Sequence, residues 1–242
     1  MDVVALGELL IDFTENGISS QGNPLFEANP GGDMMLTEEE IPEELILETR
    51  IFHFGTLSMT HENVRRATKK AVAIAKQAGA IISFDPNIRE PLWNSMDEAR
   101  EQVLYGLGQC HILKISDNEI QWLTGKNDYT EAVKWIREKY DIPLILVSMG
   151  KEGSRAYYQD RMVEKAPFIN KNTIETTGAG DTFCACVLHY ICKHGLENLT
   201  EKNLKEMLTY ANAAASIITT RKGALRVMPR PEEIEALIAG HH

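Results

Sequence analysis

Residues 51–84 read IFHFGTLSMTHENVRRATKKAVAIAKQAGAIISF, and this stretch decides the fold. Ile51–Phe54 and Ile81–Phe84 are short apolar runs of the kind that form buried strands. Between them, apolar residues recur at the helical spacing, and the pattern stops before Gly79, a residue type common just after a helix. The stripe consists of Val64, Ala67, Ala71, Ala75 and Ala78. A strand, a helix and a second buried strand predict a parallel pair.

The same alternation continues along the chain. The expected elements are a helix near 97–107, a strand His111–Ile115, helical segments over 117–139 separated at Gly125, a strand Leu144–Val147, an antiparallel pair Ser154–Gln159 and Met162–Lys165, helices Ala179–His194 and Glu201–Thr219, a short strand Ala224–Met228 and a final helix. This order predicts an α/β fold with a doubly wound, mostly parallel sheet flanked by helices. In such sheets, ligands bind at the carboxyl ends of the strands.

The N-terminal part does not fit this plan. We expect a first strand over Val3–Phe13, yet no helix of useful length separates it from the strand at Ile51. A parallel crossover normally requires one. We therefore expect sequence to be absent at the junction of Gly32 and Asp33.

Composition and charge narrow the function classes. The chain has 242 residues, 43% of them hydrophobic, and 35 acidic against 25 basic residues give a net charge of −10. Such a composition suits a single domain, here residues 1–240, and an acidic surface argues against nucleic acid and membrane partners. No basic segment precedes the apolar start, and no apolar run reaches the roughly 20 residues of a membrane span, so we expect a cytoplasmic protein. Cys184 and Cys186 are interpreted as buried thiols in a reducing compartment.

The sharpest local signal is the stretch Glu175–Phe183, which reads ETTGAGDTF and opens a predicted helix. Consecutive small residues (Gly178, Ala179 and Gly180) allow several backbone N–H groups to face one space, and the helix dipole adds positive potential there. Asp181 stands in the first turn, where a carboxylate can take a proton from a nearby hydroxyl. The alternative is a glycine-rich helix start with Asp181 as a capping residue.

Other common catalytic motifs are absent from the sequence. Gly150-Lys151 is followed by Glu152 and lacks the glycine of a P-loop, and no G-x-G-x-x-G follows the first strand. Neither H-E-x-x-H nor G-x-S-x-G occurs. Nicotinamide enzymes, zinc hydrolases and serine hydrolases are therefore disfavoured.

At this point the sequence resembles a known family. ETTGAGDTF is similar to the D-T-x-G-A-G-D signature of the ribokinase-like, phosphofructokinase-B type carbohydrate kinases. Further stretches in the same order resemble bacterial fructokinases: GELLIDF from residue 7, FDPNIREPLW from 84, LKISDNEIQWLTG from 113, SMGKEGS from 148 and RKGAL from 221. The resemblance implies a doubly wound α/β core with a small β lid over the sugar, expected here around residues 14–36 and only partly present.

The resemblance also implies roles for individual residues. Asp181 would be the general base, and the backbone amides of residues 178–180 would hold the γ-phosphate. The sugar-binding residues implied are Asp12, Gly31, Gly32 and Arg89. Gly31-Gly32 matches only the start of the family's G-G-x-x-x-N loop, because Asp33 begins unrelated sequence. Asp12 alternatively ends a strand, and Arg89, in the string D-P-N-x-R, alternatively ties its loop to Glu90 or Asp97.

The nucleotide positions implied are Ser116, Ser148, Gly150, Gly153 and Asn212. Ser116 replaces the asparagine of the family's N-x-x-E motif, and Glu119 matches its carboxylate, associated with Mg²⁺ through water. Each position also has a purely structural alternative: a solvated helix residue for Glu119, a tight turn for residues 148–153 and a packing role for Asn212. A monovalent cation, K⁺, is implied at Glu175, Thr177, Ile218, Arg221 and Gly223, with Glu175 where aspartate is usual.

These observations lead to one functional hypothesis with two alternatives. We expect an ATP-dependent sugar kinase, with ATP and Mg²⁺ as cofactors, that transfers the γ-phosphate to the C6 hydroxyl of fructose. The first alternative keeps this chemistry with 2-keto-3-deoxygluconate, ribose or a nucleoside as acceptor. The second is a non-catalytic sugar- or nucleotide-binding remnant, motivated by the junction at residues 32 and 33. The resemblance further implies a homodimer formed through the lid.

Overall fold

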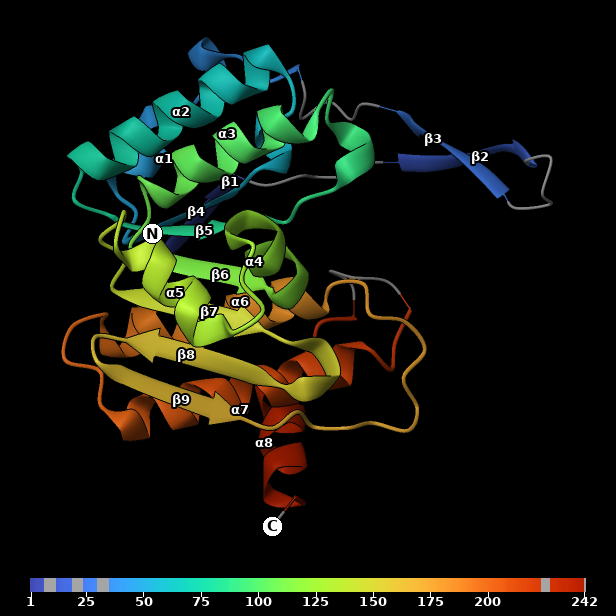
Figure 1. Ribbon diagram of the computed structural model, residues 1–242, viewed down its shortest axis with the longest axis vertical. Coiled ribbons are helices and arrows are strands. Elements are labelled where there is room, and N and C mark those ends of the chain that lie inside the picture. The colour runs from blue at the N-terminus through green and yellow to red at the C-terminus, as the bar shows by residue number, and fades with distance from the viewer. Residues whose placement is uncertain (7–11, 19–23, 30–34, 223–226, 242) are drawn as a thin grey trace. The chain divides into compact units, whose positions relative to one another are not determined.

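The computed structural model describes residues 1–6, 12–18, 24–29, 35–222 and 227–241 (Figure 1). These residues form two compact units, Met1–Gln109 and Cys110–His242. Each unit has its own strands, helices and buried core, and each is described by itself below. Among the described residues, no helix combines the length and the apolar character that crossing a bilayer requires.

The first unit contains three parallel strands. In the order β1 (Val3–Leu6), β4 (Ile51–Gly55) and β5 (Ile81–Asp85), each strand is hydrogen-bonded to the next. The helical elements are η2 (Glu38–Glu40), α1 (Glu43–Leu47), η3 (Leu57–Met59), α2 (Glu62–Gln77), η4 (Glu90–Leu92) and α3 (Met96–Leu107). A separate antiparallel pair is formed by β2 (Asp12–Ile18) and β3 (Pro24–Asn29).

Aromatic packing fixes the core of this unit. Phe52, Phe54 and Phe84 are fully buried, and the ring centroids of Phe54 and Phe84 lie 4.8 Å apart. A Cβ atom on Gly106 of α3 would lie 2.3 Å from the ring of Phe84, so glycine lets the helix approach the sheet closely. Of the predicted α2 stripe, Val64, Ala67, Ala71 and Ala75 are buried, whereas Ala78, the C-cap residue, is exposed; Gly79 follows at φ 75°.

The described residues of the second unit form four strands. β6 (Ile112–Ser116) and β7 (Leu144–Ser148) are parallel, and β8 (Ser154–Tyr158) and β9 (Arg161–Lys165) continue the sheet antiparallel. Its helical elements are α4 (Asp117–Thr124), α5 (Tyr129–Arg137), η5 (Gly150–Glu152), α6 (Ala179–His194), α7 (Glu201–Ile218) and α8 (Pro231–Ala239).

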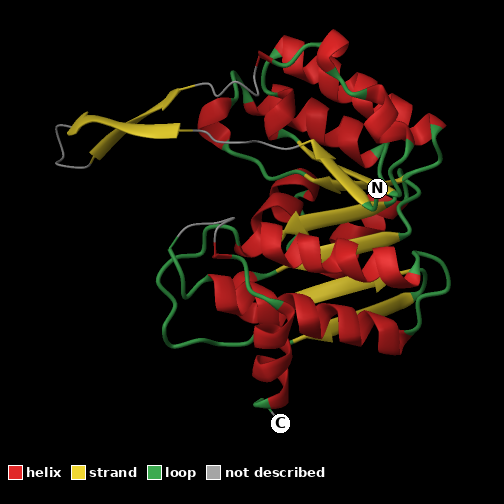
Figure 2. Cartoon of the chain, turned by 180° about the vertical axis from the view of Figure 1, so that it is seen from behind, coloured by secondary structure: helices red, strands yellow, loops and turns green. Residues whose placement is uncertain are grey.

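Helices cover both faces of this second sheet. α4 packs on β6 and β7. α7 packs on β8 and β9 and also contacts α6. The two helix pairs α4–α5 and α6–α7 lie on opposite faces (Figures 1 and 2). Burial on both faces explains why β6 and β7 are apolar at almost every position rather than at alternate ones. The expected α/β class with mostly parallel strands is confirmed.

Two expected elements differ from the observed ones. β1 ends at Leu6, and Asp12 and Phe13 belong to the β2–β3 pair, so a single strand over Val3–Phe13 is wrong. The mostly apolar composition of residues 3–13 does not reveal this change of partner, because an apolar pattern does not report which sheet a segment joins. Of the expected strand Ala224–Met228, the first three residues lie outside the described ones, and Val227 and Met228 are not in a strand.

The connection from β1 to β4 agrees with the sequence reading. Its helical elements, within the described residues, are only η2 and the five-residue α1. The β2–β3 pair falls in the range expected for the lid. The lid assignment, the single domain over 1–240 and the absent sequence at residues 32 and 33 stay predictions.

Candidate active site

Residues 178–180, at the start of α6, form a glycine turn next to N–H groups that have no backbone acceptor among the described residues. Gly178 has left-handed geometry (φ 76°, ψ −1°) that glycine adopts without strain, and α6 begins at the next residue. The first helical hydrogen bond runs from Thr182 N to Gly178 O (2.9 Å). Within the described residues, no side chain caps this helix and no carbonyl accepts from the N–H groups of Gly180 or Asp181. Two donors at the positive end of the helix dipole therefore suit an anion.

Asp181 lies in the first turn of α6, directly after this glycine turn. Its side chain is exposed, and no hydrogen bond or ion pair to its carboxylate occurs among the described residues. The capping role considered from the sequence is therefore not what these residues show. An accessible carboxylate next to an anion-binding turn can accept a proton from a hydroxyl group held between them.

The segment leading into the glycine turn lies against the end of α7. Both Ile174 N and Glu175 N donate to Thr219 O, at 2.8 and 3.2 Å. The end of α7 is in turn tied to α8, because Arg221 pairs with Glu233 and donates to Val227 O (3.2 Å). Arg221 also holds the pKa of the Glu233 carboxyl below its usual value.

These contacts bring part of the expected K⁺ set together. Glu175 lies beside the C-terminal turn of α7, which includes the buried Ile218 and ends next to Arg221. Thr177 is exposed, and Gly223 lies outside the described residues. Backbone carbonyls at such a helix end are ligands that suit a monovalent cation in principle.

Ser116 and Glu119 close the N-terminus of α4 as a capping box. Glu119 Oε2 accepts from Ser116 N (2.9 Å) and from Ser116 Oγ (2.8 Å), and Ser116 Oγ accepts from Glu119 N at 3.4 Å. The described residues contain no group of three or more His, Cys, Asp or Glu side chains able to hold a metal. Glu119 would therefore serve Mg²⁺ as one carboxylate among water and phosphate oxygens, which this ion accepts.

The turn after β7 depends on two glycines. Ser116 pairs with Ser148 in register, and Ser148 pairs with Ser154, so three serines form a row across the carboxyl edge of β6 and β7. Gly150 has φ 51° and Gly153 has φ 97°. A Cβ on Gly153 would lie 2.1 Å from the carbonyl oxygen of Lys165. The turn is therefore a structural requirement as well as a candidate nucleotide contact.

Asn212 is a buried residue of α7 with clear packing partners. Its Oδ1 accepts from Ser154 Oγ at 2.8 Å, and its Nδ2 donates to the carbonyls of Lys165 (3.3 Å) and Ala166 (3.1 Å). These bonds fasten α7 to β8 and to the end of β9. They support the packing alternative, and a contact of Asn212 with nucleotide stays a prediction.

The expected sugar residues belong to the first unit. Asp12 is paired with Asn29 in the β2–β3 ladder, while Gly31 and Gly32 lie outside the described residues. Arg89 is exposed and donates to Ile88 O (3.2 Å). In the same string, Asp85 is buried at the carboxyl end of β5 and Asn87 takes φ 44°. A left-handed asparagine bends the chain sharply as it leaves the strand.

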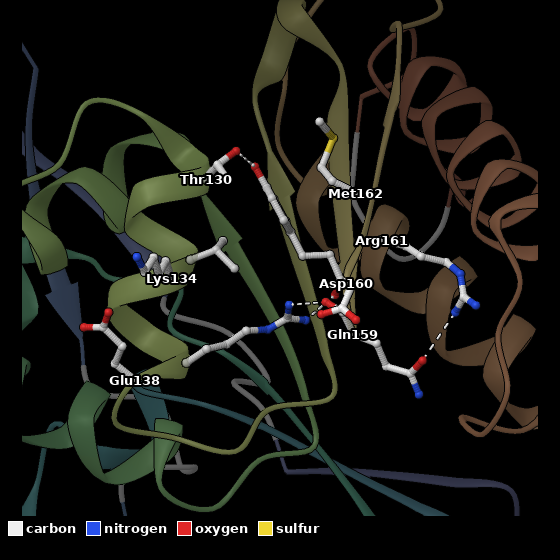
Figure 3. A pocket seen from close by; sticks show the side chains of 10 residues that line it. Thr130, Lys134, Glu138, Gln159, Asp160, Arg161 and Met162 are labelled. Carbon is white, nitrogen blue, oxygen red and sulfur yellow. Dashed lines mark hydrogen bonds between the residues drawn. The ribbon is translucent and has the colours of Figure 1, made fainter.

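A surface hollow in the second unit is not at these residues. It has a volume of about 370 Å³ and is lined by residues of α5 and the β8–β9 hairpin (Figure 3). Since Tyr158 pairs with Leu144, the hollow lies at the amino end of β7, opposite to the serine row. Arg137 closes it by donating to the carbonyls of Gln159 (2.7 Å) and Tyr157 (3.0 Å). None of the predicted site residues therefore lines the hollow.

One residue beside the glycine turn was missed by the sequence analysis. Lys114 of β6 is 6% exposed, and its ammonium group lies next to Gly180. The available signal was a lysine inside the mostly apolar strand ILKIS, where charged residues are rare.

Known proteins have a similar fold and a related sequence. A double mutant of fructokinase from Vibrio cholerae O395, solved with fructose, ADP and potassium ion, is 26% identical, with a TM-score of 0.78 over 94% of this chain and 71% of the other. Fructokinase from Xylella fastidiosa with bound ATP, at 24% identity and a TM-score of 0.82 over 92% of this chain and 72% of its own, shows the fold alone. These similarities confirm the ribokinase-like α/β fold.

Curated relatives include plant fructokinases. Fructokinase-1 of Zea mays is 39% identical over 214 residues, which are 88% of this chain and 66% of the maize protein. Probable fructokinase-2 of Arabidopsis thaliana is 38% identical over 85% of this chain and 62% of its own length. The chain thus spans just under two thirds of these relatives. The family model "pfkB family carbohydrate kinase" matches residues 17–231, so this chain belongs to the pfkB family of carbohydrate kinases.

Proposed function

We propose that the protein is an ATP-dependent sugar kinase that phosphorylates the C6 hydroxyl of fructose. The observation that carries the proposal is the start of α6, where two N–H groups without a carbonyl acceptor among the described residues stand beside the exposed Asp181. Membership of the pfkB family and the similarity to fructokinases support the same chemistry. Because the chain spans less than two thirds of the curated relatives, activity and substrate are proposals.

In this mechanism Asp181 accepts the proton of the C6 hydroxyl as the sugar oxygen attacks the γ-phosphorus of ATP. The new O–P bond forms while the bond from the γ-phosphorus to the β,γ-bridging oxygen breaks, and ADP leaves with that electron pair. The N–H groups of the glycine turn stabilise the charge on the transferred phosphoryl oxygens. Asp181 thus takes the proton, and the N–H groups stabilise the charge. These roles suit phosphoryl transfer, in which alignment and electrostatics supply most of the acceleration.

The ions have supporting roles in the proposal. Bound Mg²⁺ would supply positive charge to the phosphates; Glu119 would hold the ion through water, and Ser116 and Ser148 would contact the nucleotide. K⁺ would bind carbonyls near the end of α7 and the segment at Glu175, where the hydrogen bonds to Thr219 O already fix the backbone. Its expected effect is to hold the glycine turn in its anion-binding geometry.

Sugar binding is proposed for Asp12, Gly31, Gly32 and Arg89. Hydroxyl groups of fructose suit the Asp12 carboxylate, and the guanidinium of Arg89 suits an anionic group of substrate or product. The cytoplasmic location and a homodimer formed through the β2–β3 region also stay proposals. The four cysteines, all free thiols, agree with a reducing compartment.

A panel of sugars tests the function. ADP release is measured with fructose, 2-keto-3-deoxygluconate, ribose and a nucleoside, each with and without K⁺. We expect turnover with fructose to exceed that with the other acceptors and to rise with K⁺. Preference for another sugar would reassign the substrate. The absence of any sugar-dependent turnover, together with an intact mass near 27.2 kDa, would favour the non-catalytic remnant.

A further inference from the structure

Thr182 closes the glycine turn from its C-terminal side. Its backbone N–H donates to Gly178 O at 2.9 Å, which is the first helical hydrogen bond of α6. Its side chain is 2% exposed, whereas the side chain of Asp181, the preceding residue, is exposed. Of these two neighbours, Asp181 therefore presents its carboxylate to solvent, and Thr182 is held inside the protein.

The buried hydroxyl of Thr182 donates a hydrogen bond to a residue far along the chain. The acceptor is Met228 Sδ, at 3.3 Å, and this is the one hydrogen bond of the Thr182 side chain among the described residues. A thioether sulfur is a weak acceptor. A buried hydroxyl without any acceptor is costly, however, so the bond to Met228 fixes the orientation of the Thr182 side chain.

Met228 is itself held in place by the start of α8. The carbonyl of the preceding residue, Val227, accepts from Arg221 at 3.2 Å, and Arg221 pairs with Glu233 in the first turn of α8. α8 packs on α7, and its residue Ile234 is buried in that contact. The sulfur atom therefore belongs to a segment that is fastened to two helices.

The entrance of the glycine turn is fastened to the end of α7 as well. Glu175 N donates to Thr219 O at 3.2 Å, so residues 175–182 are held before the turn by α7 and after it by the segment of Met228. The N–H groups of Gly180 and Asp181 lie between these two attachments and have no carbonyl acceptor among the described residues. The two attachments thus set the direction of these N–H groups.

We propose that Thr182 is a positioning residue for the phosphoryl transfer and that Met228 is the acceptor that fixes its hydroxyl group. The inference rests on the proposed function, because it concerns the alignment of Asp181 with the transferred group. Thr182 does not touch the substrates in this proposal. It holds the first turn of α6, so that the Asp181 carboxylate and the N–H groups keep one relative geometry. A misplacement of about 1 Å at a reacting centre can lower a rate about 10²-fold.

The test removes the hydroxyl group of Thr182 and keeps the branched shape of the side chain. In sugar-dependent ADP release, we expect Thr182→Val to lower kcat at least about 10-fold. The KM values for ATP and fructose should stay within a few-fold of wild type, because alignment is lost rather than substrate binding. Thr182→Ser keeps the hydroxyl group and should retain most of the activity. Near-normal kcat in folded Thr182→Val would overturn the proposal.

Thr68→Val is the matched control for the loss of a buried hydroxyl group. Thr68 is fully buried in α2, and its hydroxyl group donates to Ser58 O and Val64 O at 2.8 Å each. We expect Thr68→Val and Thr182→Val to be less stable in urea unfolding, whereas only Thr182→Val lowers kcat. Equal losses of kcat in the two variants would assign the effect to stability and contradict the positioning role.

A double variant tests Met228 as the partner. Met228→Leu removes the sulfur acceptor and keeps an apolar side chain of similar volume. If Thr182 acts through this contact, Thr182→Val combined with Met228→Leu should lose no more kcat than Thr182→Val alone. Losses that multiply in the double variant would contradict the contact.

Hydrogen exchange separates this inference from the proposed function. If the wild-type chain phosphorylates no sugar, the proposed function fails by itself, and the contact is judged by exchange of the Thr182 amide proton. Faster exchange in Met228→Leu than in wild type supports the assignment, and equal exchange overturns it. Met207→Leu is the control, because Met207 is 1% exposed on α7 and accepts no hydrogen bond within the described part of the chain.

Discussion

Asp181 directly follows Gly180, the last residue of the glycine turn. The proposed general base and the proposed anion-binding turn therefore form one local structure. Helix geometry fixes this relation, because residues 178–181 include both the left-handed turn and the first turn of α6. A hydroxyl oxygen beside the carboxylate is thereby directed at a phosphorus atom beside the N–H groups. In the proposed mechanism, the chemistry depends on this short segment for any sugar.

Replacing Asp181 by asparagine removes the proton acceptor and keeps the shape. We expect Asp181→Asn to lower kcat about 10²- to 10⁴-fold, the usual contribution of a general base. Coupled ADP release measures this loss, and calorimetric binding of ATP should remain close to wild type. Activity within a few-fold of wild type would show that another group takes the proton.

Gly153 allows a prediction about stability. Gly153→Ala places a Cβ 2.1 Å from the carbonyl of Lys165 in a backbone with φ 97°, so both strain and overlap oppose it. We expect a loss of about 2–4 kcal/mol in urea unfolding. Gly79→Ala is the control, because its φ of 75° is strained but its Cβ would meet nothing within 4 Å. Equal losses in the two variants would contradict the proposed overlap.

For individual residues, the sequence predicted the backbone conformation of some glycines well but did not predict some side-chain contacts. Gly79 and Gly125 end helices with positive φ, as their type and place suggest. The sequence did not predict Lys114, since only the packing of α6 over β6 brings its ammonium group to Gly180. The roles of Glu119 and Asn212 also depend on partners far apart in sequence or on the geometry of a cap.

The helices and strands were predictable where their pattern is periodic and bounded by turn residues. α6 begins and ends where expected, because a glycine turn precedes it and Gly195 follows it. β6–β9 lie within one or two residues of the expected strands. The different pairing of β1 and β2 was not predictable, since a mostly apolar sequence gives no sign that two neighbouring strands join different sheets.

The N-cap serines of α3 and α4 allow a comparison of a structural role with a proposed nucleotide-binding role. Ser95 Oγ accepts from Glu98 N at 3.1 Å, as Ser116 Oγ accepts from Glu119 N. We expect Ser95→Ala and Ser116→Ala each to lower unfolding free energy by about 0.5–2 kcal/mol. Only Ser116→Ala should also raise the KM for ATP, which steady-state kinetics measures. An unchanged KM in Ser116→Ala would assign this serine to the cap alone.

Several carboxylates of the described residues have pKa values below their usual range, among them Glu98. The Arg65 guanidinium, and after it the Asn94 amide, hold the pKa of Glu98 below its usual value by hydrogen bonding. Arg65 of α2 pairs with Glu98 of α3, so this contact joins two helices of the first unit. A lowered folded-state pKa contributes stability above the usual carboxyl range, and that stability is lost as the pH falls through the folded-state value.

Acid titration of stability tests this contribution. We expect Glu98→Gln to be less stable than wild type in urea by about 1 kcal/mol near pH 7. The difference should disappear at a pH below the folded-state pKa, where wild-type Glu98 is protonated as well. A difference that stays constant with pH would assign the effect of the substitution to packing instead of charge.

The fold of the whole chain was predictable because buried parallel strands and amphipathic helices leave strong patterns. The residues proposed to bind sugar were less predictable, since Asp12 lies between β1 and β4 and Arg89 lies in the loop after β5, where the chain has little periodic sequence. The match to the maize protein covers 66% of that protein, and the absence of sequence at residues 32 and 33 stays a prediction.

The most direct test of the central claim is a crystal structure with fructose, ADP, aluminium fluoride and Mg²⁺. The account predicts that the fluoride group, in the place of the transferred phosphoryl group, lies at the N–H groups of Gly180 and Asp181, with the C6 hydroxyl oxygen within about 3 Å of the Asp181 carboxylate. A fluoride group bound away from the start of α6 would contradict it.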